Sequence, residues 1–360
     1  MTAWDYPGAE RALEQAAKGA ERAGDAGLQA YALVGRLWVE HVGGEPDYGR
    51  LRAQARQALE VLERVADDRG TARAWYLLAV EAVQRCQVAE AEAAYRHAIE
   101  VARRAGDERT LAGIQSNMAL HAIWGPVPVA EGIERCERTL AEAGTNRRVE
   151  LSALGALAVL RAMDGQAEAA RALVERTMEI GQEFAVRHVA AQIGQFAGLA
   201  MLLAGDAEAA EARLRWGYDL LEDMGDVGWR SELSADLARV LYARGRLDGA
   251  EAFALISQEI SGPEDLYSHT GAGGILAKVL AGKGELARAV ELAEGAVATA
   301  DRTDMLNMRA DARADLAEVL RLAGRPGEAR AALASAIELY RAKGNRSSAE
   351  AAGRLLGAMA

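Results

Sequence analysis

The feature that most constrains the fold is a repeat of about 40 residues that runs through most of the chain. Small or turn-forming residues mark each repeat at nearly constant spacing, and an alanine follows each marker five positions later. Self-similarity of this period is typical of stacked helical repeats. The markers are Cys86, Gly125, Gly165, Gly205, Gly245, Gly284 and Gly324, and the alanines are Ala91, Ala130, Ala170, Ala210, Ala250, Ala289 and Ala329.

Each repeat is predicted to be a hairpin of two antiparallel helices. The first helix ends at the marker, where a left-handed residue closes a helix. The alanine after the marker, and small residues before it such as Ala79 and Ala158, let the two backbones approach closely. A second break follows each return helix, as in "RAGDE" at 104–108 and "AKGNR" at 342–346. The pattern predicts about 18 antiparallel helices and no sheet.

Composition excludes several classes of protein. The net charge of −11 disfavours a duplex nucleic-acid binder, which needs a basic surface. The longest apolar run, 196–205, is too short to cross a bilayer, and the N-terminal residues lack a secretory signal. Two cysteines form no disulfide framework. We therefore expect a reduced, cytoplasmic protein that binds neither nucleic acid nor membrane.

One repeat carries a recognisable signature. The stretch "AWYLLAVEAVQRCQVAEAEAAYRHAI" at 74–99 resembles a tetratricopeptide repeat (TPR), with Cys86 in place of the usual turn glycine. The family repeat has 34 residues, so the helices or loops are extended here. The resemblance implies an all-α superhelix with a concave groove lined by the first helices. The matching residues are Trp75, Leu78, Ala79, Ala91, Tyr95 and Ala98.

The resemblance implies one TPR-like solenoid over residues 1–360. Residues 8–25 are predicted to be an orphan helix, 26–344 about eight helix pairs, and 345–360 a capping helix. The segment 303–345 is similar to the C-terminal repeat arms of actinobacterial signalling ATPases, including those fused to adenylate or guanylate cyclase domains. In that family the arms sense or scaffold. The ATPase and cyclase domains lie upstream, so neither activity is carried over.

No group of residues in the sequence predicts a catalytic, phosphate-binding or metal site. The stretch "GAGGILAKVLAGKG" at 271–284 lacks the spacing of a phosphate loop, so small residues for close helix packing are the better interpretation. The five histidines show no metal-ligand spacing, and Cys136 has no histidine within one helical turn. We expect no catalytic residue, no metal and no cofactor, and hence no enzyme.

The predicted function is therefore binding. We expect a protein–protein interaction module, a scaffold or sensory arm of bacterial signalling, that holds a protein or peptide in its groove; self-association is left open. The alternative is a small-molecule-sensing domain of a transcriptional regulator. The lysine and asparagine set with which some TPR proteins clamp a C-terminal carboxylate is missing. The predicted groove residues are Arg73, Tyr76, Gln115, Gln192, Gln195, Phe196, Leu199, Arg239 and Tyr242, with ligand contact centred on Gln115 to Leu199.

Overall fold

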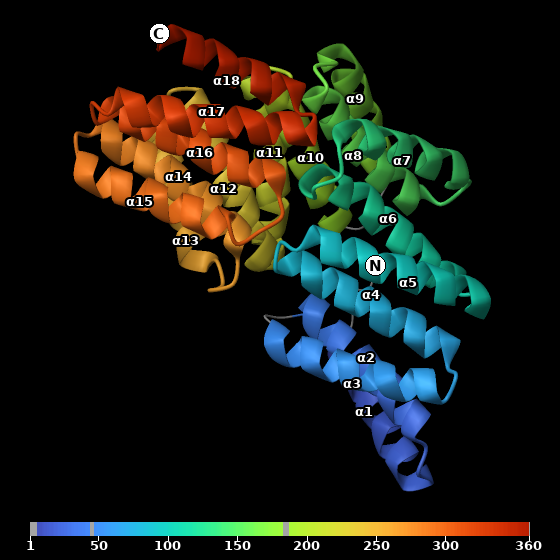
Figure 1. Cartoon of the computed structure of the whole chain (residues 1–360). Coiled ribbons are helices and arrows are strands. Elements are labelled where there is room, and N and C mark those ends of the chain that lie inside the picture. The colour runs from blue at the N-terminus through green and yellow to red at the C-terminus, as the bar shows by residue number, and fades with distance from the viewer. Residues whose placement is uncertain (1–5, 44–46, 183–186, 360) are drawn as a thin grey trace. The chain divides into compact units, whose positions relative to one another are not determined.

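The computed structural model describes residues 6–43, 47–182 and 187–359 of the chain. Over these residues it contains eighteen α-helices and no strand (Figure 1). This confirms the prediction of an all-α TPR-like solenoid. In the same described segments, no helix combines the length and the apolar character needed to cross a membrane.

The chain divides into two compact units, Met1–Met118 and Ala119–Ala360. Over its described residues, unit 1 contains five complete helices and most of a sixth, which crosses the boundary. In chain order they are α1 (Tyr6–Ala23), α2 (Ala26–Gly43), α3 (Tyr48–Arg64), α4 (Asp68–Gln84), α5 (Val88–Ala105) and α6 (Glu108–Trp124).

Unit 2 begins with the last turns of α6 and continues with twelve helices along its described residues. They are α7 (Val129–Glu142), α8 (Arg147–Met163), α9 (Ala167–Gln182), α10 (Arg187–Leu203), α11 (Ala207–Met224), α12 (Gly228–Ala243), α13 (Leu247–Ile260), α14 (Leu266–Gly282), α15 (Leu286–Ala300), α16 (Leu306–Leu322), α17 (Pro326–Lys343) and α18 (Arg346–Ala358).

The turns follow the sequence markers closely. Cys86 adopts a left-handed backbone with φ of 56°, which only glycine adopts readily, so the residue does replace the signature glycine. Gly165, Gly205, Gly245, Gly284 and Gly324 have the same left-handed conformation. Their return helices bury the signature alanine, as Ala210 illustrates with no exposed surface.

The α6–α7 turn departs from this pattern. Gly125 is not left-handed, although it was predicted to close a helix like the other markers. The return helix α7 starts at Val129, which is buried, whereas Ala130 is exposed. Two prolines in "GPVP" at 125–128 fix an extended connection here instead of a tight left-handed turn. The small buried residue of this return helix is Gly132, which lies three residues after the first helical residue, as Ala210 does in α11.

Unit 2 folds back on itself, so that its last helices pack against its first. The buried ammonium of Lys343, at the end of α17, donates hydrogen bonds to the carbonyls of Ala122, Gly125 and Val127, at 2.7, 2.7 and 2.6 Å. Ser347 Oγ donates to Ala162 O at 2.6 Å, which joins α18 to α8 (Figure 1). The inner helices of six hairpins thus surround a common interior.

Candidate ligand-binding cavity of unit 2

The interior of unit 2 contains a cavity of about 240 Å³. Its wall comes from the first helix of every hairpin in the unit, α6, α8, α10, α12, α14 and α16, and from the start of α18. The lining residues are Ile123, Trp124, Val159, Met163, Leu199, Leu202, Leu203, Ala235, Asp236, Arg239, Tyr267, Gly271, Met305, Asn307, Met308, Asp311, Asn345 and Ser348.

One side of the cavity is apolar. Leucines of α10 and the methionines Met163, Met305 and Met308 supply most of this surface. Methionine side chains are flexible and polarizable, so they adapt to ligands of different shape. An apolar wall with a few convergent polar groups is typical of ligand sites in proteins.

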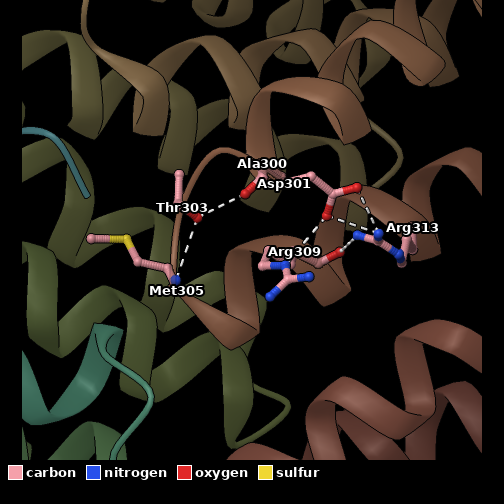
Figure 2. Close-up of polar contacts among 6 residues, drawn as sticks. All are labelled: Ala300, Asp301, Thr303, Met305, Arg309 and Arg313. Carbon is pink, nitrogen blue, oxygen red and sulfur yellow. Dashed lines mark hydrogen bonds and ion pairs between the residues drawn. The ribbon is translucent and has the colours of Figure 1, made fainter. Parts of the chain in front are cut away.

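The α15–α16 turn places Met305 at this wall. Thr303 Oγ1 donates to Ala300 O at 2.8 Å and accepts from Met305 N at 3.3 Å, while Asp301 receives two 2.8 Å hydrogen bonds from Arg313. Figure 2 shows Met305 extending away from the Asp301–Arg313 ion pair. The turn is therefore fixed on its polar side, and the thioether is left to line the cavity.

The polar part of the lining, called the polar wall below, includes Asp236 of α12. Its carboxylate accepts hydrogen bonds from Gln195 Nε2 at 3.0 Å and from the Tyr267 hydroxyl at 2.9 Å. Trp229 Nε1 donates to Gln195 Oε1 at 2.8 Å, which fixes the amide orientation. Tyr267 also meets the ring of Trp124 edge to face, with centroids 5.3 Å apart. Asp236 is thus held rigidly by groups that are all neutral.

One turn further along α12, Arg239 forms an ion pair with Asp311 of α16 at 2.8 Å. The Tyr340 hydroxyl donates a hydrogen bond to the same carboxylate. Arg239 and Asp311 are each about 30% exposed, so this pair faces the cavity rather than the core.

Burial is the main influence on the protonation of the carboxyl groups on α12. It raises the pKa of Asp236 to about 6, although the hydrogen bonds from Gln195 and Tyr267 and the charge of Arg239 act in the opposite direction. Burial and the charges of Asp265 and Asp236 also raise the pKa of Glu232, one turn before Asp236, well above its ordinary value. Burial therefore disfavours the charged form of both carboxyl groups on α12.

Asparagines join the cavity to the contact that closes the unit. Asn345 caps the N-terminus of α18, where its Oδ1 accepts from Ser348 N at 3.1 Å, and its Nδ2 donates to Asn307 Oδ1 at 3.0 Å. Asn307 Nδ2 in turn lies 3.5 Å from Met163 Sδ. The residues that fasten α18 to α16 and α8 thus also line the cavity.

The structure brings only part of the predicted groove set to this cavity. Leu199 and Arg239 line it, as do Val159, Asp236 and Asp311, which occupy groove positions by the same signature count. Tyr242 lies on α12 and donates to Glu318 at 2.7 Å, outside the lining.

Two predicted contacts of α10 are buried instead. Phe196 is 5% exposed and packs in the core, where a Cβ on Gly155 would come within 3.3 Å of its ring. Gln195 is 2% exposed and acts through its hydrogen bond to Asp236. Gln192 is half-buried and does not line the cavity.

The remaining predicted residues belong to unit 1. Arg73 donates to the Tyr31 hydroxyl at 2.6 Å, and the Tyr76 hydroxyl accepts from Asn117 at 3.2 Å. Gln115 is half-buried on α6. Their role as partner contacts stays a prediction.

Sequence reasoning missed several lining residues. Trp124, Met305 and Asn345 sit at helix ends or caps, where counting from the mid-helix signature assigns no groove position. Tyr267 starts α14, one turn before the first glycine of the cluster at 271–274. The large side chains directly beside the turns could have indicated these lining residues.

The features examined for chemistry have structural roles. Gly274 of the stretch 271–284 lies in α14, where an added Cβ would approach Asp315 Oδ2 to 2.4 Å, as expected for close helix packing. Burial raises the pKa of Cys136 to about 12, so its thiol is neutral. Within the described ranges, no group of three or more His, Cys, Asp or Glu side chains is arranged to hold a metal ion.

The fold is that of known TPR-like proteins, although no protein-family model and no curated protein matches the sequence. A Rap protein complexed with Competence and Sporulation Factor is 14% identical, with a TM-score of 0.56 over 99% of this chain and 95% of that one. The apo form of RapI is 13% identical, with a TM-score of 0.53 over 93% and 97%. The human IFIT1 dimer with m7Gppp-AAAA is 13% identical, with a TM-score of 0.55 over 96% and 76%.

Proposed function

We propose that this chain is a non-catalytic binding module that takes part of a protein or peptide partner into the interior of unit 2. The observation that carries the proposal is the cavity, because its wall is assembled from all six hairpins of the unit. A site built from every repeat couples ligand contact to the arrangement of the whole unit. This is a suitable construction for a scaffold or a sensory arm.

The volume of the cavity limits what enters it. A space of about 240 Å³ accommodates one or two side chains at the end of a peptide. The same volume suits a small metabolite, so a small-molecule sensor is the second candidate function. In either case the leucines and methionines hold the apolar part and the polar wall orients the ligand.

The cellular setting is proposed from the resemblance of this chain to other repeat proteins. The similarity of 303–345 to the repeat arms of actinobacterial signalling ATPases suggests a regulator in the bacterial cytoplasm. A Rap protein with this fold was solved with Competence and Sporulation Factor, so the fold accommodates a bound factor in at least that protein.

A peptide selection tests the site. Peptides from a random phage-displayed library that bind the full chain are measured by calorimetry against two variants. Leu199→Trp fills the cavity and should weaken binding at least about tenfold, because the ligand loses its apolar contacts. Leu247→Trp makes the same change on an exposed leucine of α13 and should leave binding unchanged.

Binding of the selected peptides can also contradict the proposal. If they bind Leu199→Trp as tightly as the unmodified chain, they recognise another surface and the cavity is not the binding site. Thermal unfolding of both variants establishes that each is folded.

A further inference from the structure

The polar wall of the cavity carries more carboxylates than cations. Asp236 and Asp311 both line it, whereas Arg239 is the one basic residue of the lining. Arg239 is paired with Asp311 at 2.8 Å. The hydrogen bonds to Asp236 come from neutral donors, and Arg239 acts on it only through its charge, because the ion pair of Arg239 is with Asp311.

The carboxylate oxygens of Asp236 can each accept a further hydrogen bond. One oxygen accepts from Gln195 and the other from Tyr267, and a carboxylate oxygen has two lone pairs. Both donors are neutral, so they orient the group without cancelling its charge. The residue is only 3% exposed and belongs to the lining of the cavity. A donor entering the cavity would find a fixed acceptor there.

The energetics of Asp236 favour a positive partner. Burial disfavours the charged carboxylate, as its raised pKa reflects. A cation beside it would relieve this penalty, because a buried charge is tolerated when it is paired and hydrogen-bonded. Groups that are electrostatically strained in this way cluster at functional sites.

An anionic ligand fits less well. Its only basic partner would be Arg239, which already pairs with Asp311, and it would lie in the same cavity as the carboxylates of Asp236 and Asp311. The aromatic rings point to a cation as well. Trp124 and Tyr267 meet edge to face at the wall, and aromatic faces attract cations within about 6 Å.

We propose that the cavity binds a primary ammonium group carried on a short apolar body, with the ammonium hydrogen-bonded to Asp236 and the apolar body against Met163, Leu199 and Met308. This inference rests on the proposed function, because it names the ligand chemistry of the same cavity. Such a group occurs in a small amine, at a peptide N-terminus and on a lysine side chain. These sources share one chemistry and are separated by the choice of probe.

Phenethylamine and phenethyl alcohol form the first test, by calorimetry on the full chain at pH 8. The two probes have the same size and shape, and only the amine carries a charge. The amine should bind saturably and at least about tenfold more tightly than the alcohol. Equal binding of the two probes, or absence of amine binding, overturns the inference.

Two aspartate variants form the second test. Asp236→Asn should weaken phenethylamine binding at least about tenfold and leave the alcohol unaffected. Asp315→Asn removes the same charge from a buried aspartate of α16 that pairs with Lys278 outside the lining, and amine binding should persist. Loss of amine binding in both variants, or in neither, contradicts the role of Asp236. The comparison of amine with alcohol needs no variant, so it stands even if one variant fails to fold.

Peptide probes identify the source of the ammonium. Phe-Ala-Ala amide presents a free N-terminus, N-acetyl-Phe-Ala-Ala amide removes that charge, and N-acetyl-Ala-Lys-Ala amide presents only a lysine. Binding of the first or third probe that depends on Asp236 supports the inference with a peptide source. Binding of phenethylamine alone supports it with a small amine. If selected peptides still require an unfilled cavity at Leu199 while every ammonium probe fails, the ligand class is wrong and the proposed function stands.

Discussion

At the scale of single residues, Asp236 is a buried carboxyl whose charged form is disfavoured by burial. Asp236 is 3% exposed, and its carboxylate is held only by the neutral groups of Gln195 and Tyr267. A neutral side chain of the same shape would cost less to bury. Retaining a carboxyl there is consistent with a role in recognition rather than in folding.

The first prediction concerns Asp236 and pH. The folded pKa of about 6 lies above the ordinary aspartate pKa of 3.8, so between these pH values the native state binds more protons than the unfolded state. The unfolding free energy therefore falls as the pH rises through this window. Ionisation of Asp236 costs about 3 kcal/mol in total, at about 1.4 kcal/mol for each pKa unit.

Asp236→Asn removes this dependence. The variant should be more stable than the unmodified chain at pH 8, and the difference should shrink as the pH is lowered from 8 to 4. Urea unfolding at several pH values measures it. A difference that does not change with pH would show that Asp236 is not buried with an unfavourable charge.

The α10 residues predicted to contact a partner lie in different environments. Leu199, predicted from the repeat signature, does line the cavity. Phe196 lies on the same inner helix but turns into the core, because Gly155 on the neighbouring helix leaves room for its ring. The space for this ring depends on which residues of the two helices face each other. Counting within one repeat does not contain this information.

At the scale of elements, the hairpin turn decides which residue lies between two helices. Where the marker is left-handed, as at Gly205, the alanine five residues later is buried. Where prolines follow the marker, after Gly125, α7 begins at Val129, Ala130 is exposed and the small buried residue is Gly132. The repeat was therefore predictable from sequence, while its local register depended on turn chemistry that only the backbone reveals.

The second prediction uses this difference. Ala210→Leu should destabilise the chain by about 1–3 kcal/mol, because the larger side chain forces α10 and α11 apart. Ala130→Leu changes the same signature position on an exposed site and should alter stability by less than about 0.5 kcal/mol. Urea midpoints compare the two. Equal midpoints would mean that the alanine does not set the distance between the helices.

At the scale of the whole molecule, closure of unit 2 is the feature that sequence reasoning did not anticipate. The rotation between adjacent repeats is small, and its sum over six hairpins determines whether the ends meet. No local motif encodes that sum. Lys343 and Asn345 contact residues of α6 and α16 that lie far away in the sequence. The prediction of one solenoid over 1–360 stays a prediction, and two compact units are what the chain shows.

The third prediction concerns this closure. Lys343→Met leaves the carbonyls of Ala122, Gly125 and Val127 without their buried cationic donor and should destabilise unit 2 by about 3–5 kcal/mol. Amide hydrogen exchange should become faster in α7, α17 and α18. Lys283→Met removes an exposed lysine that pairs with Glu251 and should cost less than about 1 kcal/mol. Unchanged exchange in α17 and α18 would mean that Lys343 does not hold the unit closed.

The central claim is that ligands enter the interior of unit 2, and methionine methyl NMR tests it most directly. Of nine methionines, Met163, Met305 and Met308 line the cavity, while Met118 and Met359 lie outside the lining. Adding a peptide selected by the unmodified chain should shift the methyl resonances of the three lining residues and leave those of Met118 and Met359 in place. Shifts confined to Met118 or Met359, with the three lining methyl groups unmoved by a bound peptide, would contradict the claim.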